Sequence, residues 1–279
     1  MQTQYQFNCG KYQLNLNRPH VMGIVNVTPD SFSDGGQYSS TDLAVAHGLE
    51  LIAEGADILD IGGESTRPGA PPVSLDEELR RVMPVIEALS AVSTVPLSID
   101  TYKPEVMRSA IAAGIDIVND VRALQEDGAV EVVANSDVGV CLMHMQGMPQ
   151  TMQLAPSYQD VVSEVVQFLT DRMHLAMSAG ITPDRIVLDP GFGFGKTTAH
   201  NIALIQQLTQ IGDIGRPLLV GLSRKSVLGK IAGGDEQQRL HAGLAASVIS
   251  AMKGAKIVRV HDVKATVDAL KIVAAVMPV

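Results

Sequence analysis

Four polar residues lie at or just after the ends of four different short apolar segments. They are Asp100, Asn119, Asp189 and Lys225. Carboxylates accept hydrogen bonds, an amide both accepts and donates, and an ammonium group donates. Buried without partners, each such group costs several kcal/mol, so together they require one another or a ligand. The set predicts a pocket for a flat heterocycle with amino and ring N–H groups, although a strand-end aspartate also commonly caps the next helix.

A second set suits an anion. Arg259 and His261 alternate on one apolar segment, so their side chains point the same way and can grip a phosphate or diphosphate at two points. The alternative is a solvated arginine beside a core histidine. Asn26 ends the first apolar segment, where its carbonyl oxygen can bind a hard cation that also holds diphosphate. A turn-forming asparagine is the alternative for Asn26.

Two long loops rich in glycine and proline follow the first two apolar segments. Residues 27–40 carry Phe32, and residues 64–72 carry Arg67. Such loops can order over a bound substrate as lids. A plain surface loop is the other interpretation of each.

One glycine-rich motif does not bind a nucleotide in the usual way. The segment GFGFGKT at 191–197 has Pro190 where a P-loop needs glycine, and its glycine spacing is not that of a dinucleotide fold. It can instead place Phe194 beside an aromatic ligand near Asp189. Lys225 alone could form a Schiff base, but the adjacent Arg224 favours ion pairing.

The elements that must position these residues alternate along the chain. Short apolar runs bounded by Gly, Pro, Asn or Asp predict eight buried strands: 21–27, 57–63, 95–100, 115–120, 138–143, 185–189, 217–221 and 255–260. Amphipathic stretches between them predict helices. Their start and stop signals include Thr41 as a cap, Ser74 with Glu77 at capping-box spacing, and Pro104 in a first turn.

A strand followed by a helix, repeated eight times, predicts an α/β protein with a TIM (β/α)₈ barrel. The eight repeats favour this closed barrel over an open doubly wound sheet. We expect one domain over residues 1–279, with residues 1–20 as an N-terminal hairpin. In such a barrel the active site lies at the carboxyl ends of the strands. Nearly every predicted strand has a polar residue at its carboxyl end, which agrees with an active site there.

Composition narrows the class of protein. The chain has 279 residues, 46% hydrophobic and 18% charged, with a net charge of −9. These values exclude a disordered or fibrous protein and argue against a nucleic-acid or membrane surface. Two cysteines cannot build a disulfide framework, no apolar run is long enough to span a membrane, and the N-terminus lacks signal-peptide order. We therefore expect a soluble, cytoplasmic protein.

Taken together, eight segments resemble the dihydropteroate synthase family, the folate-pathway target of sulfonamides. They are MGIVNVTPDSFSDGG (22–36), DIGGESTRPGA (60–70), SIDTYKPEV (98–106), IVNDVRAL (117–124), LMHMQGMP (142–149), LDPGFGFGK (188–196), LVGLSRKS (219–226) and RVHDV (259–263). The first two are highly specific. One difference is Tyr102, where many relatives are expected to carry a small residue, and it could narrow the mouth of the barrel.

The resemblance implies a transferase that joins (7,8-dihydropterin-6-yl)methyl diphosphate to p-aminobenzoate, with Mg²⁺, giving 7,8-dihydropteroate and diphosphate. It implies that the pterin is bound by Asp100, Asn119, Asp189 and Lys225. It implies that diphosphate and Mg²⁺ are held by Thr66, Asn26, Arg259 and His261. It implies a p-aminobenzoate and sulfonamide region of Phe32, Arg67, Pro68, Phe194, Lys225 and Ser226, with Asp34 ordering the closed site. It also suggests a homodimer through the C-terminal helices.

Two other functions stay open. A pterin-binding methyl-transfer domain would share the fold and the pterin pocket, but it would lack the STRPG loop and the diphosphate grip. A non-catalytic paralogue would have lost some of Asn26, Arg67, Lys225 or His261, and all four are present. We therefore expect the synthase.

Overall fold

A barrel of parallel strands forms the centre of the molecule. The computed structural model describes residues 5–28, 40–65, 69–148, 151–235 and 239–277. Within these ranges eight parallel strands close in the order β10-β3-β4-β5-β6-β7-β8-β9. They are β3 (His20–Asn26), β4 (Ile58–Gly62), β5 (Leu97–Asp100), β6 (Ile117–Asp120), β7 (Gly139–Met143), β8 (Ile186–Asp189), β9 (Leu218–Val220) and β10 (Ala255–Val260). The predicted (β/α)₈ barrel is confirmed, and each strand lies within two residues of its expected bounds.

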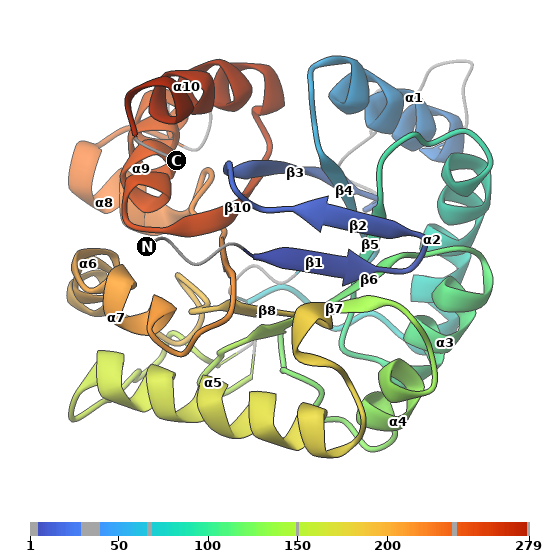
Figure 1. The fold of residues 1–279 in the computed structure, drawn as a ribbon, viewed down its shortest axis with the longest axis horizontal. Helices are drawn as coiled ribbons and strands as arrows, with labels where there is room; N and C mark the ends of the chain where they lie inside the picture. The colour runs from blue at the N-terminus through green and yellow to red at the C-terminus, as the bar shows by residue number, and fades with distance from the viewer. Residues whose placement is uncertain (1–4, 29–39, 66–68, 149–150, 236–238, 278–279) are drawn as a thin grey trace.

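Helices surround the strands, as Figure 1 shows. They are α1 (Ser40–Ala53), α2 (Leu75–Ser90), α3 (Pro104–Ala112), α4 (Ala129–Ala134), α5 (Val161–Ser178), α6 (Thr198–Gln206), α7 (Leu208–Gly212), α8 (Ser226–Ala232), α9 (Leu240–Met252) and α10 (Val263–Val276). A 3-10 turn, η2 (Pro183–Arg185), precedes β8. The sequence signals had indicated the longer helices, whereas α4, α6, α7 and α8 are too short to show a clear apolar period.

Helix starts follow the expected chemistry with one exception. The hydroxyl of Ser74 accepts a hydrogen bond from the backbone N–H of Glu77 at 3.3 Å, which caps α2. Pro104 occupies the first turn of α3, where its missing N–H costs nothing. The expectation for Thr41 is wrong, because α1 already begins at Ser40 and Thr41 lies inside the helix.

A two-stranded antiparallel hairpin precedes the barrel. In Figure 1, β1 (Gln6–Cys9) and β2 (Tyr12–Asn15) cross the barrel opening that faces the viewer. Phe7 packs so closely against β7 that a side chain at Gly139 would lie 2.5 Å from its ring. The hairpin therefore covers the amino ends of the strands and leaves the carboxyl ends for chemistry.

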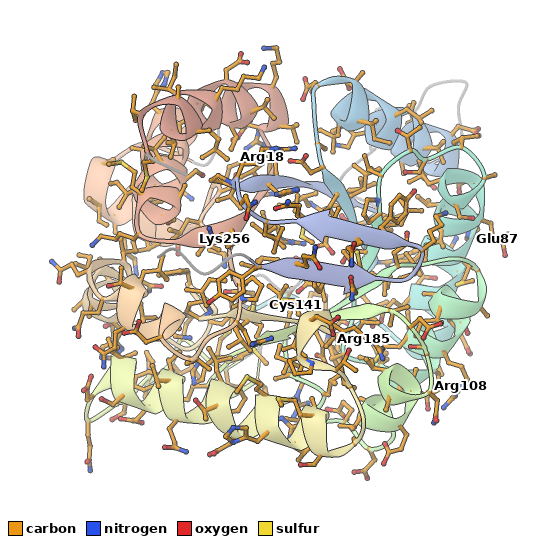
Figure 2. The ribbon with its side chains drawn as sticks, viewed as in Figure 1. Arg18, Glu87, Arg108, Cys141, Arg185 and Lys256 are labelled. Carbon is orange, nitrogen blue, oxygen red and sulfur yellow. The ribbon has the colours of Figure 1, made fainter. Side chains whose placement is uncertain are left out.

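Most buried apolar side chains of the described residues form two layers, and a third, smaller group contains Phe194. The larger layer fills the space between strands and helices, and it includes Val118, Val140 and Leu188. The smaller layer fills the barrel beneath the hairpin: Phe7, Cys9, Leu16, Met22, Ile58, Ile117, Cys141, Val187, Leu219 and Ile257. Cys141, labelled in Figure 2, belongs to this inner layer, and both cysteines are free and buried. No helix among the described residues is long and apolar enough to cross a membrane.

Candidate active site

The inward faces of the strands change from apolar to charged over one step of the strand period. Because side chains alternate along a strand, a residue two positions after an inner-layer residue also faces the barrel interior. Ile58 is followed in this way by Asp60, Ile117 by Asn119, Val187 by Asp189 and Ile257 by Arg259. The polar side chains therefore meet inside the barrel mouth, at the carboxyl ends of the strands.

Arg259 stands between two carboxylates. Its Nε donates to Asp60 Oδ2 at 2.5 Å, and its Nη2 donates to Asp100 Oδ2 at 2.7 Å. The amide of Asn119 also donates to Asp60 Oδ2, at 3.0 Å. Burial alone would lower the pKa of Arg259, but Asp60 and Asp100 raise it above its ordinary value. Three strands are thus joined through one guanidinium group that stays charged.

Burial dominates the protonation of Asp100. It raises the pKa of this carboxyl to about 7, against the opposing charge of Arg259 and with a smaller contribution from Asp60. Asp60 itself is fully buried, and its Oδ1 has no hydrogen-bond partner among the described residues. Such an acceptor is costly unless a donor reaches it. The cluster therefore presents acceptors suited to the N–H groups of a ligand.

Asp189 and Lys225 face each other across the same mouth. Asp189 is 4% exposed, and its Oδ1 accepts from the backbone N–H of Gly191 at 2.7 Å. Burial raises the pKa of Asp189, while the nearby Lys225 charge opposes this. Burial lowers the pKa of Lys225 to about 8, opposed by Asp189. Lys225 Nζ also donates to the carbonyl of Phe192 and lies 4.5 Å from the centre of the Phe194 ring.

The structure thus brings together Asp100, Asn119, Asp189, Lys225 and Arg259, the first four of which the sequence analysis expected to converge. Gly221, which follows β9, borders both cations. A side chain there would begin 3.8 Å from Arg259 Cβ and 3.9 Å from Lys225 Nζ. Both are ordinary van der Waals distances, so Arg259 and Lys225 lie on either side of this backbone position.

Three of the residues expected to hold diphosphate, Asn26, Arg259 and His261, lie at the same end of the barrel. His261 lies one residue beyond β10, and its Nδ1 is 3.1 Å from Ser223 Oγ. The Nε and Nη2 atoms of Arg259 are engaged by Asp60 and Asp100. Asn26 ends β3, and its Oδ1 would be 4.0 Å from a Cβ at Gly62. Asp60, which the sequence analysis did not single out, is what orients the guanidinium group.

The loop after β8 approaches the strand ends through its backbone. Gly191, Gly193 and Gly195 all have positive φ. A side chain at Gly191 would begin 1.8 Å from the carbonyl oxygen of His144, so only glycine fits. Phe194 is 8% exposed and packs with Val121, Met143 and Met152. The glycines serve close backbone contact, in agreement with the rejection of a nucleotide-binding loop.

Several expected residues cannot be placed or lie at the rim. Phe32, Asp34, Thr66, Arg67 and Pro68 lie outside the described residues. Ser226 is the exposed first residue of α8, next to Lys225. These assignments remain predictions.

A charged cluster at the base of the 64–72 loop was not anticipated. Lys103 Nζ pairs with both Glu64 and Glu78, and it lies 4.6 Å from the centre of the Tyr102 ring. Tyr102 also packs against the group that contains Phe194. The side chain of Tyr102 therefore lies on the mouth side of the barrel. The sequence signal for this cluster was weak, because its members are up to 39 residues apart.

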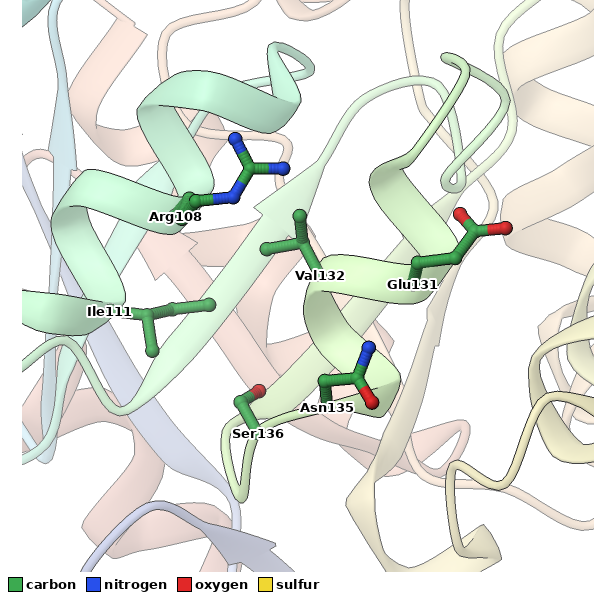
Figure 3. A pocket seen from close by; sticks show the side chains of 6 residues that line it. All are labelled: Arg108, Ile111, Glu131, Val132, Asn135 and Ser136. Carbon is green, nitrogen blue, oxygen red and sulfur yellow. The ribbon is translucent and has the colours of Figure 1, made fainter.

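A pocket on the outer surface is separate from this site. It has a volume of about 260 Å³ and lies between α3 and α4 (Figure 3). Its lining residues are Arg108, Ile111, Glu131, Val132, Asn135 and Ser136. These come from the outer helices and their ends, so none of them reaches the polar residues inside the barrel.

Comparison with known proteins settles the family. The family described as pterin binding enzyme matches residues 22–261. A dihydropteroate synthase of Neisseria meningitidis serogroup B is 52% identical over 277 residues, which cover 97% of each chain. The chain belongs to the dihydropteroate synthase family. The resemblance drawn from the eight segments is therefore confirmed.

Solved structures of family members agree in fold. Xanthomonas albilineans dihydropteroate synthase with 4-aminobenzoic acid superimposes with a TM-score of 0.94 at 54% identity, covering 99% of this chain and 100% of that one. The same organism's enzyme in complex with 7,8-dihydropteroate gives a TM-score of 0.90 at 51% identity, covering 98% and 99%. Both belong to the dihydropteroate synthase family, so its members share this barrel over nearly their full lengths.

Proposed function

We propose that this chain condenses (7,8-dihydropterin-6-yl)methyl diphosphate with p-aminobenzoate to give 7,8-dihydropteroate and diphosphate. The observation that carries the proposal is one barrel mouth that combines buried carboxylates with Lys225 and Arg259. The carboxylates can accept hydrogen bonds from the N–H groups of a ring, and the two cations can bind a departing anion. The two Xanthomonas structures contain 4-aminobenzoic acid and 7,8-dihydropteroate. These ligands correspond to the second substrate and the product of the proposed reaction.

The pterin would bind between Asp100, Asn119, Asp189 and Lys225. The carboxylates accept its amino and ring N–H groups, and Asn119 supplies both a donor and an acceptor. Asp60 holds Asn119 and Arg259 through one oxygen, Oδ2. Its role is therefore to keep both side chains in place beneath the ring.

In the reaction, the bond between the methylene carbon and the diphosphate oxygen breaks, and its electron pair leaves with diphosphate. The electron-rich dihydropterin delocalises the positive charge left on the methylene carbon. The arylamine nitrogen then forms the new C–N bond and loses one proton to solvent. Asp100 and Asp189 favour the cation, while Arg259 and His261 stabilise the charge that grows on diphosphate.

The p-aminobenzoate would lie beside the loop after β8. Phe194 offers an aromatic ring with Lys225 Nζ 4.5 Å from its centre, and Ser226 follows Lys225 as the first residue of α8. We assign Phe32, Asp34, Arg67 and Pro68 to the loops that close over it, and Thr66 to the diphosphate. Closure would keep water from capturing the cation. Sulfonamides, which share the arylamine, would compete for the same place.

The donor set in the mouth fits a Mg²⁺ ion that arrives with the substrate. Among the described residues no three His, Cys, Asp or Glu side chains gather into a protein-only metal site. Mg²⁺ is usually held by one or two protein oxygens together with substrate phosphates and water. We propose that Asn26 Oδ1 is that protein oxygen. When bound there, the ion would neutralise charge on the leaving diphosphate.

We also propose a homodimer that acts in the cytoplasm. The C-terminal helices α9 and α10 expose Ile249, Met252, Ile272 and Val276, of which Val276 is 68% exposed. Burying such side chains against a second copy is favourable. The two buried free thiols suit a reducing compartment. Sedimentation of Ile272→Glu beside the unaltered chain tests the interface, and an unchanged mass would refute it.

Diphosphate release tests the main proposal. It is measured from (7,8-dihydropterin-6-yl)methyl diphosphate with and without p-aminobenzoate, in Mg²⁺ and then in EDTA. We expect release that requires both p-aminobenzoate and Mg²⁺, with dihydropteroate formed in equal amount. Pterin binding without release would contradict the proposal and favour a methyl-transfer domain or a non-catalytic paralogue.

A further inference from the structure

The loop after β8 has an unusual hydrogen-bond pattern. Each backbone carbonyl from residue 191 to residue 195 accepts a hydrogen bond from a side chain. Lys196 donates to the carbonyls of 191 and 194, Lys225 to 192, Gln153 to 193 and Tyr158 to 195. One backbone hydrogen bond forms within the loop, from the Phe194 N–H to the Gly191 carbonyl at 3.1 Å, and the other four carbonyls accept from side chains. The shape of this loop is therefore set by a few side chains.

Lys196 makes more of these contacts than any other of the four donors. Its side chain is buried, 3% exposed. Its Nζ lies 2.8 Å from the carbonyl oxygen of Gly191, 3.0 Å from that of Phe194 and 2.9 Å from Nδ1 of His144. The carbonyl oxygen of His144 also lies 3.4 Å from Nζ, so four acceptors surround the amino group. Lys196 thus joins the two ends of the loop to the residue that follows β7.

The protonation of His144 agrees with this geometry. Burial and the neighbouring Lys196 charge lower the pKa of His144 to about 3. The ring is therefore neutral, and Nδ1 can accept a hydrogen bond. Phe168 packs edge-on against the same ring at 4.9 Å between centres, which fixes its orientation. The ring that carries the acceptor for Lys196 is therefore packed against a second aromatic side chain.

Stability alone does not explain a lysine at this position. Burying an amino group costs free energy that its hydrogen bonds must offset, and burial lowers the pKa of Lys196 well below its ordinary value. What Lys196 gives the molecule is a defined shape of the loop. The two residues whose placement depends on that shape are Phe192, whose carbonyl binds Lys225, and Phe194, whose ring lies under Lys225.

We propose that Lys196 is a positioning residue for the p-aminobenzoate side of the site. It acts through Gly191 and Phe194, and it sets where the Phe194 ring and the Lys225 ammonium group stand. The inference rests on the proposed function, because it assigns these two side chains to p-aminobenzoate. Of the proposed pterin residues, Lys225 contacts this loop, whereas Asp100 and Asn119 lie on β5 and β6 outside it, so pterin binding should depend on Lys196 less than p-aminobenzoate binding does.

Lys196→Met tests this, with Arg185→Met as its matched control. Arg185 also donates to two backbone carbonyls, those of Val138 and Val133, each at 2.8 Å, but near the amino ends of the strands (Figure 2). Both variants should unfold at lower temperature. We expect Lys196→Met to raise KM for p-aminobenzoate by about tenfold or more, since small misplacements in a site are costly. The Kd for the pterin substrate should change less, and Arg185→Met should leave KM within about twofold of its original value.

A second pair of variants decides the question if Lys196→Met does not fold. His144→Leu removes one acceptor of Lys196, and His144→Asn returns an oxygen acceptor. We expect His144→Leu to raise KM for p-aminobenzoate several-fold and His144→Asn to restore most of it. Equal KM values in Lys196→Met and Arg185→Met, or an unchanged KM in His144→Leu, would overturn the inference. Failure of the unaltered enzyme to form dihydropteroate would instead refute the proposed function.

Discussion

The two ends of the barrel interior contrast sharply, although the same strands build both. At the hairpin end the inward side chains are apolar, and Ile58, Ile117 and Val187 are almost completely buried. One step along each strand, the inward side chains become Asp60, Asn119 and Asp189. The distance between the two layers is only two residues of strand, roughly 7 Å.

This difference shows how the fold separates stability from chemistry. The apolar end needs no ligand, because its side chains satisfy one another and the hairpin covers them. The charged end carries Asp60, Asp100 and Asp189 against the cations Lys225 and Arg259. Such a cluster is costly to bury unless it is paired or binds a ligand. Variants at the two ends should therefore affect different measurements.

The largest effect is expected at Arg259. Arg259→Met leaves Asp60 and Asp100 without their cation, and removing one partner of a buried ion pair costs about 3–5 kcal/mol of unfolding free energy. Dihydropteroate formation should also fall by about 10²–10³-fold, as when a group that stabilises transition-state charge is lost. Urea denaturation and product assays measure the two effects.

Arg18 provides the control for this variant. It pairs with Asp57 outside the barrel, and its side chain is 58% exposed. Arg18→Met should cost less than about 1 kcal/mol and leave turnover unchanged. Similar stability losses in Arg18→Met and Arg259→Met would contradict the importance assigned to the interior cluster.

The next effect should be confined to stability. Phe7→Ala empties a fully packed position beneath the barrel and should cost about 3–5 kcal/mol. Its KM for p-aminobenzoate should stay unchanged below the unfolding temperature. Phe194→Ala, at the other end, should raise that KM while destabilising the fold less. A rise in KM in Phe7→Ala would show that the two ends are coupled.

The smallest expected effect is a dependence on pH. Because the pKa of Asp100 is raised to about 7, its carboxyl is mostly protonated at pH 6 and mostly ionised at pH 8. If the ionised form accepts the pterin N–H group, affinity for the pterin substrate rises about tenfold from pH 6 to pH 8. Calorimetry at several pH values measures this. Asp100→Asn should bind more weakly and lose the slope, and a slope that persists in the variant would assign the titration to another group.

The sequence predicted the strands well because buried parallel strands are short continuous apolar runs with clear boundaries. The polar residues at their ends were found for the same reason, as Asn119 and Asp189 occupy the last or next-to-last position of such runs. Asp60 was missed because it lies inside the run DILDIGG, where it was counted as part of the strand. The two-residue alternation with Ile58 is the signal that could have found it.

The contacts of Lys196 and Lys103 could not be predicted from the sequence. Lys196 meets His144 across 52 residues, and Lys103 meets Glu64 across 39. These pairs depend on how the barrel brings neighbouring loops together, and no local pattern encodes that register. The partners of Arg259 could not be predicted either. An arginine suits both the binding of an anion and a bridge between two carboxylates, so the residue type does not tell the two apart.

The measurement that tests this division of the barrel most directly is calorimetric titration of the pterin substrate, without p-aminobenzoate, into Asp189→Asn and Asp116→Asn. Asp116 is also a buried carboxylate, but it precedes β6 at the hairpin end, where it accepts from the backbone N–H of Leu97 at 3.0 Å. In Asp189→Asn the amide oxygen can still accept from Gly191, so the main loss is the charge. We predict that Kd rises about 10–100-fold in Asp189→Asn, since hydrogen bonds to charged groups contribute about 1.5–3 kcal/mol, and that Asp116→Asn binds as the unaltered protein does. Equal Kd values in the two variants would contradict the account.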